Sequence, residues 1–153
     1  MRIFIGSDHA GFDLKNSICE FLRREGYDVE DVGPPIYDHD DDYPDYALKV
    51  CMKVLKSKGM GILICGSGHG MDIAANKVKG IYASVCWNEE SAIVAKEHDN
   101  INVLCLGGRF VRPNAAKRIV RVWLEKPFSR EARHSRRLRK IKKIEKANLR
   151  GRQ

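Results

Sequence analysis

The chain alternates short apolar segments with longer segments of helical periodicity, and this alternation restricts its fold more than any other feature. The short segments read as strands and lie at residues 2–7, 28–33, 61–68, 81–86 and 102–108. Three of the five are almost wholly apolar, as expected when helices cover both faces of a parallel sheet. The sequence therefore predicts an α/β protein built on a five-stranded parallel sheet.

Helices are expected between these strands. Their predicted positions are about 11–25, a segment beginning near Pro44, 69–77, 88–98, 113–124 and 129 to about 147. Gly26 is suited to end the first helix, and Pro44 suits the first turn of the second. The expected architecture is a doubly wound, Rossmann-like three-layer sandwich with an added basic helix at its C-terminal end.

Charge divides the chain more sharply than length does. The 153 residues, 43% of them apolar, suffice for one compact domain, and the net charge is +8. Residues 130–153 contribute +9 and the first 129 residues −1. We expect an α/β unit over 1–128 and a basic helix and tail over 129–153 as part of the same domain. Such a tail can bind nucleic acid, bind phosphorylated small molecules or stay solvated.

Five cysteines occur without a CxxC pair, which argues against a disulfide framework and against a zinc knuckle. The first residues lack the apolar core of a signal peptide, and no apolar run approaches the length of a membrane span. The sequence thus predicts a cytoplasmic protein that neither associates with a membrane nor binds a metal ion.

The segment Cys65–Gly70 is the most informative candidate site, because ligands of doubly wound proteins bind at the carboxyl ends of strands. Its glycines allow backbone N–H groups to face an anion at a helix N-terminus, although the same pattern also makes a simple tight turn. Cys65 ends a predicted strand, where a helix dipole would favour its thiolate. A buried core cysteine is the alternative interpretation.

Other candidate residues surround this segment in the predicted topology. Asp8 and His9 follow the first strand and His98 closes the fourth helix, so we expect all three near one edge of the sheet. Arginines can hold a phosphate by paired hydrogen bonds, and the candidates are Arg109, Arg133 and Arg137. The last two stand four residues apart and share a helix face. Capping histidines and a solvated basic face are the alternatives.

Five motifs together resemble one family. They are SDHAGF near the N-terminus, DYPDYA at 42–47, GILICGSGHGMDIAANK at 61–77, GGR at 107–109 and ARHSRRL at 132–138. The combination is similar to ribose-5-phosphate isomerase type B, a family that includes the galactose-6-phosphate isomerase subunits. The resemblance implies an enzyme of the pentose phosphate pathway that interconverts ribose 5-phosphate and ribulose 5-phosphate through a cis-enediolate, without metal or cofactor.

The resemblance also implies a role for each matching residue. Cys65 matches the base that moves the proton between C2 and C1, Ser67 the hydroxyl that assists it, and His98 the group that opens the sugar ring. The backbone of the loop would stabilise the enediolate, through Gly66, Gly68, His69 and Gly70. The residues expected to bind the substrate are Asp8, His9, Tyr43, Asp99, Arg109, Arg133 and Arg137. A homodimer with shared active sites, or a tetramer, is implied, with the basic helix at the interface.

Three departures from the family pattern leave the substrate open. Asp99 stands where the family has asparagine, His69 and Asp72 add a titratable pair, and residues 136–152 are more basic than phosphate binding needs. A hexose-phosphate isomerase acting on allose or galactose 6-phosphate is one alternative. A nucleic-acid-binding protein is another, although the tail has no aromatic residues for base stacking.

Overall fold

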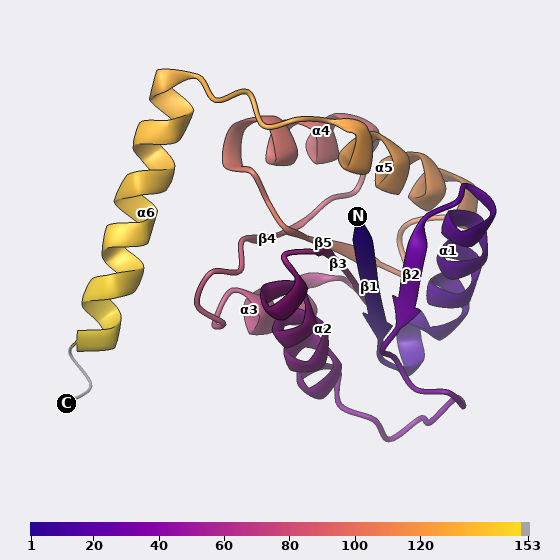
Figure 1. The fold of residues 1–153 in the computed structure, drawn as a ribbon. Coiled ribbons are helices and arrows are strands. Elements are labelled where there is room, and N and C mark those ends of the chain that lie inside the picture. Colours follow the sequence, from indigo (N-terminus) through magenta and orange to yellow (C-terminus); the bar gives the residue numbers. More distant parts are fainter. Residues whose placement is uncertain (151–153) are drawn as a thin grey trace.

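The computed structural model describes residues 1–150. Five parallel strands form one sheet in the order β2-β1-β3-β5-β4 (Figure 1). The strands are β1 (Arg2–Ser7), β2 (Asp28–Asp31), β3 (Met60–Cys65), β4 (Ala83–Val85) and β5 (Val103–Gly107). The helices are η1 (His9–Gly11), α1 (Phe12–Arg24), α2 (Tyr43–Ser57), α3 (His69–Ala75), α4 (Glu89–Asp99), α5 (Pro113–Glu125) and α6 (Ala132–Arg150).

Two apolar layers sandwich the sheet, which confirms the predicted fold class. On one face, Ile5, Ile62 and Leu104 pack with buried residues of α1, α4 and α5. On the other face, Leu63 and Cys105 pack with α2 and α3. Because successive strand residues point to opposite faces, a strand between two helical layers must be apolar throughout, as β3 is.

The two edge strands are shorter than the sequence predicted. β2 ends at Asp31 rather than at residue 33, and β4 keeps only Ala83–Val85 of the predicted 81–86. Each edge strand pairs with a single neighbour, so its regular backbone ends where that pairing ends. The glycine-rich part of the predicted segment 61–68 lies beyond β3 and forms the loop before α3.

The predicted C-terminal helix exists and lies to one side of the three layers (Figure 1). Its start lies beside the end of α4, where the Ser129 N–H donates to the Glu97 carbonyl over 3.0 Å. Its later turns reach the loop before β4, where the Gly80 N–H donates to Glu145 Oε1 over 2.7 Å. The basic tail was predicted to run to residue 153, and residues 151–153 lie outside the described part of the chain.

Close packing of the Gly11 backbone against the Ile64 backbone requires glycine at position 11. A β-carbon there would lie 2.5 Å from the Ile64 carbonyl oxygen and 2.7 Å from its carbon, although the backbone of Gly11 is unstrained (φ −101°). Gly11 thus allows η1, which follows β1, to lie directly against the end of β3.

We expect Gly11→Ala to lower the free energy of unfolding by about 1–3 kcal/mol, because overpacking against backbone cannot relax through a rotamer change. Gly26→Ala is the matched control. Gly26 has φ +84° and no atom near its missing β-carbon, so only the left-handed backbone should cost about 1–2 kcal/mol there. Urea denaturation of both variants measures the difference, and a Gly11 variant as stable as the wild type would contradict this packing argument.

Candidate active site

The loops after β3 and β5 are joined by backbone hydrogen bonds. The Gly108 N–H donates to the Cys65 carbonyl over 2.8 Å, and the Arg109 N–H donates to the Gly66 carbonyl over 3.0 Å. The Arg109 side chain lies over Gly66, where a β-carbon would be 3.2 Å from Nε. The structure therefore places a guanidinium beside the predicted anion-binding loop.

Cys65 closes β3 with its side chain buried and its sulfur hydrogen-bonded. The Gly68 N–H donates to Sγ over 3.2 Å. Gly68 precedes α3 and has φ +87°, a left-handed conformation that favours glycine. This backbone donor fixes the position of the sulfur at the start of the glycine loop.

Ser67 and His69 line a cavity of about 290 Å³ on the same edge of the sheet. The His69 N–H donates to Ser67 Oγ over 3.3 Å. Trp87 and Phe110 form part of the wall of this cavity and are largely exposed, at 68% and 77%. The rest of the cavity lining is mainly apolar, and Ser67 and His69 provide its polar groups.

Tyr43 and Asp72 flank the loop on its helical side. The Tyr43 ring, at the start of α2, covers Gly70 so closely that a β-carbon there would lie 2.6 Å from Cζ. Asp72 lies in the first turn of α3, and burial raises the pKa of its carboxyl, while the nearby His69 acts in the opposite direction. The predicted pair of His69 and Asp72 is thus close in space.

Asp8 and His9 lie at the end of β1, next to the same loop. The Asp8 N–H donates to the Ile64 carbonyl over 3.3 Å, and Asp8 Oδ1 accepts from the Gly11 N–H over 3.1 Å. Burial raises the pKa of the Asp8 carboxyl, against the opposing effects of the Gly11 N–H and His9. His9 contacts Asp41, from the acidic loop before α2, through its backbone and its ring.

The prediction that His98 lies beside Asp8 and His9 is wrong for a single chain. A helix that follows a strand returns the chain to the opposite edge of a parallel sheet. His98 and Asp99 end α4 and therefore lie at the amino edge, just before β5. The Lys96 ammonium nearby donates to the Ile101 carbonyl over 3.2 Å, and both residues pack near the start of β3.

The two helix arginines accompany His98 rather than Cys65. Arg133 and Arg137 are exposed on the first turns of α6, and Arg133 Nε donates to Glu131 Oε2 over 2.8 Å. The candidate residues thus form two groups in one chain. The carboxyl-edge group contains Asp8, His9, Tyr43, Cys65–Gly70 and Arg109, and the amino-edge group contains His98, Asp99, Arg133 and Arg137.

Two residues beside these groups were not predicted. His134 is 2% exposed, its ring centroid lies 4.2 Å from that of His98, and its Nδ1 lies 2.7 Å from Ser129 Oγ. His134 lies among arginines, and the sequence there shows no apolar periodicity that would predict its burial. Asp41 is one of five acidic residues within 38–45, and nothing in the sequence distinguishes it from its neighbours.

Within residues 1–150, no group of three or more His, Cys, Asp or Glu side chains is arranged to hold a metal ion. None of the described helices is long and apolar enough to cross a membrane.

Comparison with known proteins supports the resemblance seen in the motifs. The sequence profile of the Ribose/Galactose Isomerase family matches residues 3–141. A probable ribose-5-phosphate isomerase B of Mycoplasma genitalium is 48% identical over 88% of this chain and 90% of its own length. A ribose-5-phosphate isomerase B of Mycobacterium tuberculosis is 39% identical over 89% of this chain and 85% of its own length.

Solved structures agree with the sequence comparison. The ribose-5-phosphate isomerase B of Clostridium thermocellum superposes with a TM-score of 0.93 at 46% identity, covering 97% of this chain and 99% of that one. The Mycoplasma genitalium enzyme with bound ribulose-5-phosphate superposes with a TM-score of 0.91 at 47% identity, covering 95% and 96%. The five motifs, the matched profile and the shared fold place this chain in the ribose/galactose isomerase family.

Proposed function

We propose that this chain is a ribose-5-phosphate isomerase that uses Cys65 as its base. The observation that carries the proposal is the Cys65 sulfur, hydrogen-bonded by the Gly68 N–H at the carboxyl end of a central strand. The similar Mycoplasma genitalium structure, which contains ribulose-5-phosphate, supports the choice of substrate. An aldose-ketose isomerisation needs a base and oxyanion donors together, and the Cys65–Gly70 loop offers both.

The proposed reaction moves two protons, one from C2 to C1 and one from the C2 oxygen to the C1 oxygen, and conserves the electron count. The Cys65 thiolate removes the proton from C2 of the open-chain aldose, the C2–H electron pair becomes the C1–C2 double bond, and the C1 carbonyl becomes an oxyanion. Cys65 returns the proton to C1, while Ser67 assists the proton exchange between the two oxygens. Backbone N–H groups of the loop stabilise the enediolate, and each such donor typically contributes about 3–4 kcal/mol.

The other four cysteines are unsuited to this role. Burial raises the pKa of Cys19, Cys51 and Cys86 to about 11 and that of Cys105 well above its ordinary value. At neutral pH their thiolate fractions are therefore negligible. Cys65 is the most exposed of the five at 4%, and its sulfur accepts the Gly68 N–H.

We expect iodoacetamide at pH 8 to label Cys65 first. A thiol of pKa about 11 is only about one thousandth ionised at pH 8, so labelling of Cys19, Cys51 and Cys86 should begin only as the pH approaches 11 or the chain unfolds. Peptide mass spectrometry locates the label, and Cys65→Ala should remain unlabelled in the native state. Earlier labelling at Cys86 would count against the assignment of Cys65.

The remaining candidate residues would bind the substrate and open the sugar ring. Asp8 and His9 would contact the sugar and phosphate ends, and Tyr43 would lie near the sugar ring. Arg109 would hold the phosphate together with Arg133 and Arg137. His98 would open the furanose ring before Cys65 acts. Asp99, an exposed carboxylate, would contact a sugar hydroxyl and influence which sugar is preferred.

A homodimer would unite the two groups of residues, because each chain carries one at the carboxyl edge and the other at the amino edge. Apolar side chains support such a contact. Leu48, Met52 and Leu55 are exposed along one face of α2, and Ile141 and Ile144 are exposed on α6. We therefore propose that α6 and the end of α4 of one chain complete the Cys65 site of the other.

Cys65→Ala should lower the turnover of ribose 5-phosphate by about two to four orders of magnitude, the usual contribution of a general base, and leave substrate binding largely unchanged. Cys19→Ala, on α1 and away from the site, is the control and should retain activity. The assay contains EDTA and compares ribose 5-phosphate, allose 6-phosphate and galactose 6-phosphate at matched concentrations. Preferential turnover of a hexose phosphate would change the substrate assignment but leave Cys65 as the proposed base. Full activity of Cys65→Ala would exclude Cys65 as the base.

Mixing inactive chains tests the shared site. When Cys65→Ala and His98→Ala chains reassort, each mixed dimer has one site with both substitutions and one with neither, so activity should recover to about a quarter of the wild-type value. Each variant reassorted with itself serves as the control. If each site lay within one chain, the mixture would stay as inactive as its components.

A further inference from the structure

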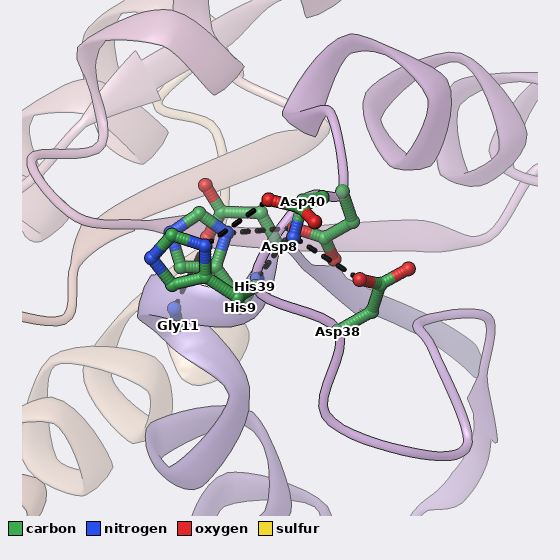
Figure 2. Close-up of polar contacts among 7 residues, drawn as sticks. Asp8, His9, Gly11, Asp38, His39 and Asp40 are labelled. Carbon is green, nitrogen blue, oxygen red and sulfur yellow. Dashed lines mark hydrogen bonds and ion pairs between the residues drawn. The ribbon is translucent and has the colours of Figure 1, made fainter.

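The acidic loop before α2 covers His9, and its residue Asp41 holds the histidine twice. Asp41 Oδ1 accepts the His9 backbone N–H over 2.9 Å and lies 2.8 Å from His9 Nδ1. The Asp41 side chain is 6% exposed and that of His9 is 24% exposed. Figure 2 shows His9 next to Asp8, with Asp38, His39 and Asp40 on the loop around it.

We propose that Asp41 is a positioning residue that keeps the proton of His9 on Nδ1 and presents Nε2 to the substrate. This inference rests on the proposed function, in which His9 contacts the sugar phosphate. It assigns a task to the acidic loop, which the family motifs leave unexplained.

The direction of the ring hydrogen bond follows from the chemistry of the two groups. A carboxylate oxygen has no proton to donate, and Asp41 Oδ1 already accepts the His9 backbone N–H. His9 Nδ1 must therefore be the donor in the 2.8 Å contact. In the neutral imidazole this leaves Nε2 as a bare acceptor for a sugar hydroxyl, and in the imidazolium it makes Nε2 a donor to a phosphate oxygen.

The ring of His9 has little freedom to turn away from this orientation. The His39 ring stacks on it at a centroid distance of 5.4 Å and an interplanar angle of 29°. The Tyr37 ring meets it edge-on at 6.2 Å and 81°. Among the described residues, the charged or titratable groups that face His9 are Tyr37, His39 and Asp41 from the loop and Asp8 from the end of β1.

The Asp41 carboxylate is buried next to His9 and Tyr46. Its second oxygen, Oδ2, makes no close hydrogen bond among the described residues. The nearby Tyr46 hydroxyl has its pKa raised, first by burial and then by the negative charge of Asp41 and a side-chain interaction with it. Burying a carboxylate costs free energy, and the two bonds to His9 offset part of that cost, so the carboxylate and the histidine hold each other in place.

The test uses the full chain labelled with ¹⁵N-histidine. Long-range ¹H–¹⁵N spectra at pH 8 report which ring nitrogen carries the proton, and the His9→Gln variant identifies the His9 signals. We expect wild-type His9 to be protonated on Nδ1, Asp41→Ala to shift it towards Nε2, and Asp41→Asn, whose amide oxygen can accept both bonds, to restore Nδ1.

Kinetics supply the functional readout. Asp41→Ala should raise KM for ribose 5-phosphate about fivefold to tenfold with a smaller change in kcat, since the loss of one hydrogen bond to a charged group has about this effect on binding. Asp41→Asn should recover most of that loss. The matched control is Asp40→Ala, which removes a carboxylate that is 94% exposed and lies 3.2 Å from the ring of the exposed His39. This control should alter neither the His9 tautomer nor KM.

Two results would overturn the inference: wild-type His9 protonated on Nε2, or an Asp41→Ala variant with unchanged tautomer and unchanged KM. The spectrum of the wild-type protein decides the first even if a variant does not fold. Because the tautomer is read without turnover, a wild-type protein inactive on ribose 5-phosphate would contradict the proposed function alone. Failure of the tautomer prediction in an active protein would contradict the role of Asp41 alone.

Discussion

Direct backbone contact among three loops at the carboxyl edge of the sheet determines the geometry of the carboxyl-edge group. The loop after β3 is joined to the loop after β5 through the Cys65 and Gly66 carbonyls. A β-carbon on Gly107 would lie 2.7 Å from the Ser67 carbonyl oxygen, and one on Gly108 would lie 2.8 Å from that of Ala10. Glycine is needed at these points because the backbones are in contact. These contacts fix the backbone around Cys65, the proposed base, and catalytic groups benefit from such preorganisation.

The same fold also separates the proposed site residues of one chain into two groups. In a βα unit the strand and its helix run in opposite directions, so residues that end helices lie far from residues that end strands. His98 ends α4, and Arg133 belongs to a helix that begins beside it. Under the proposed mechanism, His98 and the two arginines of α6 meet Cys65 only if another copy brings its amino edge to this carboxyl edge. The exposed apolar side chains of α2 and α6 are consistent with that contact.

Charge is organised around the proposed substrate in a similar way. Cationic Arg109 lies over the glycine loop, whereas the carboxylates of Asp8 and Asp41 lie around His9. An anionic substrate would be attracted to the first region and repelled by the second unless His9 is correctly oriented between them. The acidic loop is thus more than a linker between β2 and α2. In the proposed mechanism its buried member, Asp41, orients His9. Among the described residues, no hydrogen bond joins His9 to the exposed Asp38 or Asp40.

The sequence by itself determined the layered fold, because apolar runs of strand length alternate with helical periods and leave few other arrangements. It also marked Cys65 and its glycine loop as the candidate site, since local chemistry and spacing are visible in a single segment. Only the tertiary structure decided which candidates share an edge: His98 was expected beside Asp8 and lies at the opposite edge. It also singled out Asp41 and His134, whose burial depends on residues distant in the chain. Periodicity reports the local backbone, whereas contacts between loops depend on how the whole sheet is connected, and one sequence does not encode those distances locally.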